Sequence, residues 1–192
     1  MLDTHARQFV EPAIAWVARR LQGLGASANG VSLAAVGVGI AAAASVASGL
    51  PWPGIALLWL SGILDAVDGT LARLIGGNAL GAILDITFDR VVEIAVIAAL
   101  AWRHPAARFE LLLLAGAIAV AMSLFLAIAA ALPNRSIKAF HYAPGLGERT
   151  EAFIFLTLMI ADQRRLALWT ALFIGMILFT MGQRLRHAAH SG

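Results

Sequence analysis

Four aspartates, Asp65, Asp68, Asp85 and Asp89, lie close together in the sequence of an otherwise largely apolar chain. Asp65 and Asp68 are three residues apart and Asp85 and Asp89 are four apart, so each pair shares one face of a helix. The intervening GGNA, residues 76–79, predicts a turn that makes the two helices antiparallel neighbours and gathers the four carboxylates. Clustered carboxylates repel one another and are costly to desolvate, and protonation or divalent cations relieve both costs. Mg²⁺ and Mn²⁺ prefer carboxylate oxygens, so the stretch predicts a site for two divalent cations, Mg²⁺ or Mn²⁺.

Two glycines and an arginine flank these aspartates. Gly69 directly follows Asp68, and Gly81 lies one helical turn before Asp85, so both positions remove bulk beside the predicted metal site. A phosphate-bearing ligand could approach the backbone there, and Arg73 could meet its phosphate. Each feature also has a structural explanation, since glycines pack membrane helices and a lone arginine anchors a helix at the cytoplasmic face.

The composition is that of a membrane protein. Of 192 residues, 60% are hydrophobic and 13% are charged, and the mean hydropathy is +0.83. The chain has no cysteine, which excludes disulfides, thiol nucleophiles, cysteine-ligated zinc and iron–sulfur clusters. The net charge of +3 comes from basic residues between apolar runs, so membrane topology explains it and we expect no nucleic-acid partner.

The hydrophobic pattern predicts an all-α integral membrane fold. Apolar residues at helical spacing in residues 2–22 predict an N-terminal amphipathic helix in the membrane interface, within a juxtamembrane segment 1–24. A six-helix membrane domain follows over residues 25–187, and residues 188–192 form a C-terminal tail. The six transmembrane helices are expected at about 31–50, 54–74, 80–102, 109–132, 149–163 and 166–184.

The distribution of basic and aromatic residues predicts the orientation. With six spans, nine lysines and arginines fall on the side of the termini and four on the other side. Trp52, Trp102 and Trp169 fall at span ends on the side with fewer basic residues. We therefore expect both termini and the aspartates to face the cytoplasm.

Taken together, the motif reads Asp65-x-x-Asp68-Gly69-x-x-Ala72-Arg73, then Gly81-x-x-x-Asp85-x-x-x-Asp89. This string closely resembles the signature of the CDP-alcohol phosphotransferases, also called CDP-alcohol phosphatidyltransferases, the membrane enzymes that make phospholipid head-group linkages. All eight signature positions are matched. Seven residues separate Arg73 from Gly81, where the family pattern usually has eight or nine, and the difference falls in the turn.

The resemblance implies metal-dependent transfer of a phosphatidyl group from a CDP-linked lipid, such as CDP-diacylglycerol, to an alcohol acceptor, with release of CMP, in phospholipid biosynthesis. It also implies an enzyme of the bacterial inner membrane and a homodimer. By the resemblance, Asp89 is the general base, the metal ligands are Asp65, Asp68, Asp85 and Asp89, and the nucleotide pocket is lined by Gly69, Ala72, Arg73 and Gly81.

The acceptor remains open among several alcohols. Arg135, Lys138 and Arg149 could bind an anionic polyol phosphate, and the stretch GxxERxE over residues 145–151 resembles that of family members that use inositol phosphate. Acceptors of the inositol-phosphate or glycerol-phosphate type are therefore one alternative, although cytoplasmic anchoring also explains these basic residues. A cation or proton transporter is a second alternative, because carboxylates within spans commonly mark cation pathways.

Two local features carry smaller predictions. Arg90 and Glu93 follow Asp89 within the third span, where we expect them to pair with each other or with neighbours inside the bundle. Asn29 precedes the first span and is predicted to cap that helix, and the family resemblance implies that it lies near the nucleotide.

Overall fold

The computed structural model describes residues 2–131 and 149–191, and in these ranges all regular secondary structure is helical, which confirms the predicted all-α class. Two short 3₁₀ helices, η1 and η2, cover Pro105–Ala107 and Gln163–Arg165. The long helices are α1 (Leu2–Gly23), α2 (Ala28–Ala47), α3 (Pro51–Ile75), α4 (Ala79–Arg103), α5 (Arg108–Ala131), α6 (Arg149–Ala161) and α7 (Leu166–Ser191).

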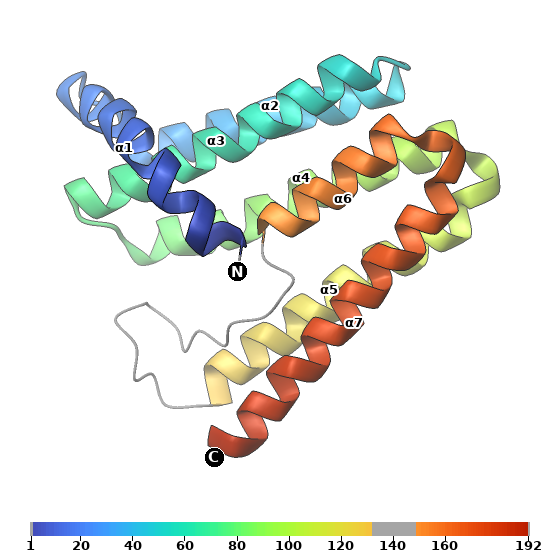
Figure 1. The fold of residues 1–192 in the computed structure, drawn as a ribbon. Helices are drawn as coiled ribbons and strands as arrows, with labels where there is room; N and C mark the ends of the chain where they lie inside the picture. Colours follow the sequence, from blue (N-terminus) through green and yellow to red (C-terminus); the bar gives the residue numbers. More distant parts are fainter. Residues whose placement is uncertain (1, 132–148, 192) are drawn as a thin grey trace. The chain divides into compact units, whose positions relative to one another are not determined.

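The described residues form two compact units, the first over residues 2–105 and the second over residues 106–131 and 149–191. In the first unit, α2 packs along both α3 and α4, and α1 packs against α3 (Figure 1). In the second unit, α7 packs against α5 and α6. The four aspartates all lie on helices of the first unit, α3 and α4.

Four stretches of the described chain are long and apolar enough to cross a membrane, as expected of an integral membrane protein. The predicted third span corresponds to α4, which carries several charged residues along its first half. The predicted fifth span corresponds to α6, whose 13 residues reach roughly 20 Å, less than the ~30 Å hydrocarbon core. The four stretches are Ala28–Ala47, Pro51–Ile75, Pro105–Ala131 and Gln163–His190.

Polar side chains set where α2 and α4 begin. The Ser27 hydroxyl accepts a hydrogen bond from the Gly30 backbone N–H at 3.1 Å and so caps α2. The prediction that Asn29 caps this helix was therefore wrong, because Asn29 already lies in the first turn of α2. Asn78 caps α4 in the same way, accepting from the Gly81 N–H at 2.7 Å.

A three-residue turn, Gly76 to Asn78, joins α3 to α4. Gly76 has φ of 85°, in the left-handed region that glycine adopts without steric cost, and this ends α3. Asn78 then starts α4 at the next residue. The turn thus brings the C-terminal part of α3 and the N-terminal part of α4 to the same end of the unit.

The helix α1 packs its apolar side on α3. Ala18 is fully buried in a cluster with Val67 and Leu71 of α3, and Ile14 and Val17 pack against the same cluster. Val67 and Leu71 flank Asp68 and its neighbours in the sequence. The N-terminal helix therefore supports the segment of α3 that carries the motif.

Small residues allow α2, α3 and α4 to approach closely. Ser61 of α3 is buried and donates a hydrogen bond to the Ala35 carbonyl of α2 at 2.8 Å. At Gly39 of α2, a Cβ atom would collide with both γ carbons of Val92 in α4. Val92 is β-branched and has little rotamer freedom to move away, so the close contact requires glycine.

Replacing Gly39 with alanine is expected to destabilise the protein by about 1–3 kcal/mol, because the new methyl group overpacks the α2–α4 contact. Gly37→Ala is the matched control, since a Cβ atom at Gly37 meets nothing within 4 Å and alanine favours the helix. Thermal unfolding in detergent measures the difference. A melting temperature of Gly39→Ala equal to or above that of Gly37→Ala would contradict this account of the packing.

Candidate functional site

Three of the four aspartates converge between α3 and α4. One carboxylate oxygen from each of Asp65, Asp68 and Asp85 can be chosen so that all three lie within 4.8 Å of one another. Asp65 and Asp68 come from the C-terminal half of α3, and Asp85 comes from the second turn of α4. Oxygens on opposite sides of a Mg²⁺ ion lie about 4.2 Å apart, since each bond is about 2.1 Å, so this spacing suits a divalent cation.

Asp68 is the most buried of the three, with 3% of its surface exposed. Its Oδ2 atom is buried and has no hydrogen-bond partner in the described part of the chain. The Ser32 hydroxyl of α2 is in hydrogen-bonding reach of the Asp68 carboxylate, and it also donates to the Ala28 carbonyl at 3.1 Å. A buried carboxylate oxygen that lacks a donor fits a metal ion, which supplies the missing positive charge.

A cavity of about 260 Å³ opens beside these aspartates, within the first unit. Asp68 and Asp85 line it, and so do the small predicted pocket residues Gly69, Ala72 and Gly81. At Gly81, a Cβ atom would lie 3.2 Å from the Asn29 side-chain oxygen, so the absence of a side chain widens this wall of the cavity. The cavity is also lined by Asn29 and by three polar residues that no motif in the sequence indicated, Ser27, Ser32 and Asn78.

Arg73, the fourth predicted pocket residue, is exposed at the end of α3 and is not among the residues that line the cavity. Its Nη2 atom donates to the Thr70 hydroxyl at 2.7 Å, and that hydroxyl donates to the Ala66 carbonyl at 3.0 Å. Its Nη1 atom lies 3.9 Å from the place where a Cβ atom of Gly69 would be. The guanidinium group is thus held over the glycine that borders the cavity.

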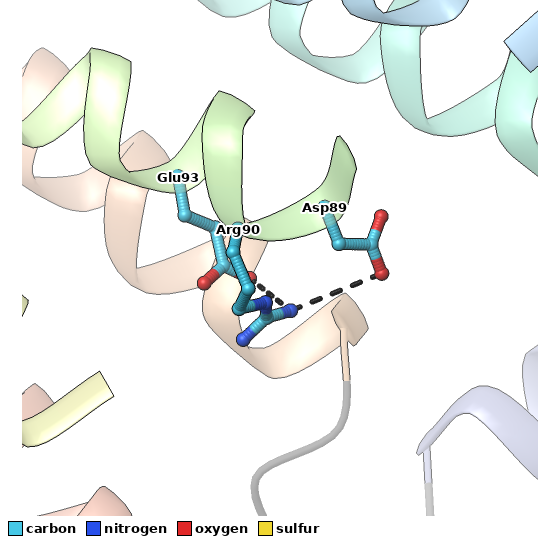
Figure 2. A network of polar contacts seen from close by, with 3 residues as sticks. All are labelled: Asp89, Arg90 and Glu93. Carbon is cyan, nitrogen blue, oxygen red and sulfur yellow. Dashed lines mark ion pairs between the residues drawn. The ribbon is translucent and has the colours of Figure 1, made fainter. Parts of the chain in front are cut away.

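Asp89 lies one turn beyond Asp85 on α4 and belongs to a second group of charges. Figure 2 shows the Arg90 guanidinium between two carboxylates, at 3.8 Å from Asp89 and at 2.8 Å from Glu93. Glu93 is almost completely buried, and the side chain of Asp89 is 18% exposed. Of the two arrangements expected for Arg90 and Glu93, the structure shows pairing with each other, and Arg90 also contacts Asp89.

Of the three basic residues predicted to bind the acceptor, Arg149 lies within the described residues, and Arg135 and Lys138 lie outside them. Arg149 is the first residue of α6. Its guanidinium lies 5.3 Å from the centre of the Phe153 ring, one turn further along the helix, in a cation–π contact.

A comparison with protein families decides the class. The sequence profile described as CDP-alcohol phosphatidyltransferase matches residues 26–181, which is most of the chain. The chain belongs to the CDP-alcohol phosphatidyltransferase family. Members of this family are transferases of substituted phosphate groups, and the transporter alternative is thereby set aside.

Relatives within the family extend over different parts of the chain. The inner membrane protein YnjF of Escherichia coli is 30% identical over 169 residues, which cover 82% of this chain and 81% of that protein. The phosphatidylinositol phosphate synthase of Corynebacterium glutamicum is 33% identical over 105 residues, 53% of this chain and 48% of that enzyme. The match to a Mycobacteroides abscessus protein of the same name spans 23% of its length. Two of these three curated relatives are therefore matched over less than half their length.

The fold is that of a solved member of the family. The Mycobacterium tuberculosis phosphatidylinositol phosphate synthase crystallised with CDP-DAG superposes with a TM-score of 0.76 at 24% sequence identity, covering 93% of this chain and 94% of that one. A second crystal structure of the same enzyme, with manganese and citrate, gives the same TM-score and identity and covers 93% and 90% of the two chains.

Proposed function

We propose that this protein transfers a phosphatidyl group from a CDP-linked lipid, such as CDP-diacylglycerol, to the hydroxyl group of an alcohol, and releases CMP. The observation that carries the proposal is the convergence of Asp65, Asp68 and Asp85, the last two of which line a cavity together with Gly69 and Gly81. The crystal structure of the mycobacterial relative with CDP-DAG bound supports a donor of this kind.

Two divalent cations, Mg²⁺ or Mn²⁺, would be held by Asp65, Asp68 and Asp85, with Asp89 as a further ligand. The buried Asp68 oxygen without a hydrogen-bond donor supports this assignment, as does the manganese in a crystal structure of the mycobacterial relative. When bound, such ions neutralise the diphosphate of the donor and stabilise the charge that develops on the transferred phosphoryl group.

The proposed reaction is a single displacement at phosphorus. The acceptor oxygen forms a bond to the phosphorus that carries the diacylglycerol, and the bond from that phosphorus to the bridging oxygen breaks, so that CMP leaves with the electron pair. Asp89 takes the proton of the acceptor hydroxyl. Its place one turn beyond Asp85 supports this role, because a base there can reach a hydroxyl bound beside the three aspartates.

The nucleotide part of the donor would occupy the cavity. Gly69, Ala72 and Gly81 leave room for the ligand to approach the backbone, and Arg73, held by Thr70, would contact a phosphate at the border. The cavity wall also offers hydrogen-bonding groups from Asn29, which suit a polar ligand such as a nucleoside.

For the acceptor, we propose an anionic polyol phosphate bound by Arg135, Lys138 and Arg149. The basic character of these residues supports this choice, because guanidinium and ammonium groups bind phosphate through charge-assisted hydrogen bonds. The names of two relatives, both phosphatidylinositol phosphate synthases, favour an acceptor of the inositol-phosphate class.

In the membrane, we propose six spans made by α2 to α7, with α1 in the cytoplasmic interface and both termini in the cytoplasm. The exposed Trp16, with the Arg20 guanidinium 5.3 Å from its ring centre, supports an interfacial place for α1. The domain division follows, with residues 1–24 as the juxtamembrane helix, 25–187 as the catalytic domain and 188–192 as the tail. We propose a homodimer in the bacterial inner membrane. The name of the Escherichia coli relative, inner membrane protein YnjF, supports this location.

The experiment that tests the function measures CMP release by the purified protein in liposomes with CDP-diacylglycerol and Mn²⁺. The acceptor panel contains inositol phosphate, glycerol phosphate, inositol and serine. We expect CMP formation that depends on the acceptor and is fastest with inositol phosphate. Absence of CMP with every acceptor would overturn the proposed function, whereas fast release with an uncharged alcohol alone would overturn the acceptor class and leave the transferase intact.

A further inference from the structure

The charges around Arg90 form a chain along one helix. Arg90 and Glu93 are three residues apart on α4 and pair at 2.8 Å, while the same Nη2 atom of Arg90 lies 3.8 Å from the Asp89 carboxylate (Figure 2). The closer contact is the one to Glu93. Glu93 therefore fixes where the guanidinium lies, and the guanidinium in turn lies beside Asp89.

Stability alone does not account for this arrangement. Glu93 has only 1% of its surface exposed, and removing a carboxylate and a guanidinium from water carries a desolvation cost that their attraction often fails to offset. Apolar residues of similar size at such a pair are commonly neutral or stabilising. In addition, Glu93 Oε2 and Arg90 Nε are buried without a hydrogen-bond partner in the part of the chain that the structure describes. Within these residues, the Arg90–Glu93 pair therefore keeps hydrogen-bonding atoms that have no hydrogen-bond partner.

The charges around Asp89 indicate how the Arg90–Glu93 pair can affect the Asp89 carboxylate. Asp89 interacts electrostatically with Arg90, Glu93, Asp85 and Asp68. The three carboxylates repel the Asp89 carboxylate, and Arg90, which lies between Asp89 and Glu93, attracts it. A cation in a fixed position therefore holds the Asp89 carboxylate in one orientation among these groups.

We propose that Arg90 is a positioning residue for Asp89, and that the buried Glu93 holds Arg90 in place. The inference rests on the proposed function, in which Asp89 accepts the proton of the acceptor hydroxyl. Arg90 and Glu93 act only through the orientation of that carboxylate. Their loss slows the proton-transfer step without weakening the binding of the CDP-linked donor.

The test compares Glu93→Gln, Arg90→Gln and the double variant in the CMP-release assay. For each single variant we expect kcat to fall about tenfold, the size of effect typical of residues that orient a ligand or base, with an unchanged KM for CDP-diacylglycerol. The kcat of the double variant is expected to equal that of Arg90→Gln, because Glu93 acts through Arg90. The two losses of kcat should therefore not multiply. Arg90→Lys should recover part of kcat, since it keeps the positive charge.

Two controls separate positioning from folding. Arg103→Gln changes an arginine at the other end of α4, whose Nη1 atom lies 3.5 Å from the Ala47 carbonyl, and is expected to leave kcat unchanged. The double variant removes the buried carboxylate together with its cation, so it stays folded even where Arg90→Gln alone does not. Melting temperatures with and without Mn²⁺ identify any variant that has lost the fold or the metal.

The outcomes distinguish this inference from the proposed function. Wild-type kcat in the folded double variant, or equal loss of kcat and donor binding, would overturn the positioning role while Asp89→Asn remains inactive. If the losses of kcat in the two single variants multiplied in the double variant, Glu93 would not act through Arg90. Full activity of Asp89→Asn would instead show that Asp89 is not the general base. That result would overturn both the role assigned to Asp89 and the positioning role inferred for Arg90 and Glu93.

Discussion

Replacing Asp89 with asparagine is expected to reduce kcat for CMP release at least a hundredfold, because a positioned general base contributes about 10²–10⁴ to the rate. Asparagine has nearly the same shape and keeps an oxygen beside Arg90, so the change removes the proton acceptor with little loss of packing. The measurement is the initial rate of CMP formation at saturating donor and acceptor.

Asp162→Asn is the matched control for that experiment. Asp162 lies between α6 and α7, where it accepts a hydrogen bond from the Trp169 indole at 3.3 Å, and asparagine can accept the same bond. This variant should keep the wild-type rate. A rate for Asp89→Asn within threefold of the control would show that another group accepts the proton.

The second large effect concerns the metal. Chelation with EDTA is expected to abolish CMP release, and Mn²⁺ should restore it in the wild-type protein. In Asp68→Asn, the Mn²⁺ concentration for half-maximal activity is expected to rise on the order of a hundredfold, because the variant loses a charged ligand from the centre of the cluster.

The thermal stability of the same variant gives an independent measurement. Bound Mn²⁺ should raise the melting temperature of the wild-type protein, since a ligand that binds only the folded state stabilises it. Asp68→Asn should lose this increase. Without metal it should melt at or above the wild-type temperature, because it relieves repulsion at a buried carboxylate next to Asp65 and Asp85. An undiminished Mn²⁺-dependent increase would contradict the assignment of Asp68 as a ligand.

Hydropathy and spacing predicted the helices of this protein well. The expected span 54–74 is α3 at Pro51–Ile75, and the expected span 80–102 is α4 at Ala79–Arg103. These boundaries were accessible because proline, glycine and asparagine mark the ends, and because long apolar runs leave no alternative to helix in a membrane. The i, i+3 and i, i+4 spacing likewise predicted which aspartates share a face.

Contacts between helices could not be predicted in the same way. Ser32 reaches Asp68 from α2, although no spacing rule connects residues so far apart in sequence. The sequence indicated that Arg90 and Glu93 pair, but not that Arg90 also contacts Asp89. Side-chain direction decides such contacts, and it depends on packing rather than on periodicity.

The turn between α3 and α4 also determines where the motif tolerates changes in length. Gly76 and Asn78 end one helix and start the next, so a residue inserted between them lengthens a loop and leaves both helical faces as they are. A residue inserted between Gly81 and Asp85 would instead rotate the rest of α4 by about 100° and turn both Asp85 and Asp89 away from Gly81's side of the helix. The short interval from Arg73 to Gly81 is therefore compatible with an intact set of carboxylates. Related sequences should vary in length in this turn and keep the intervals within each helix constant.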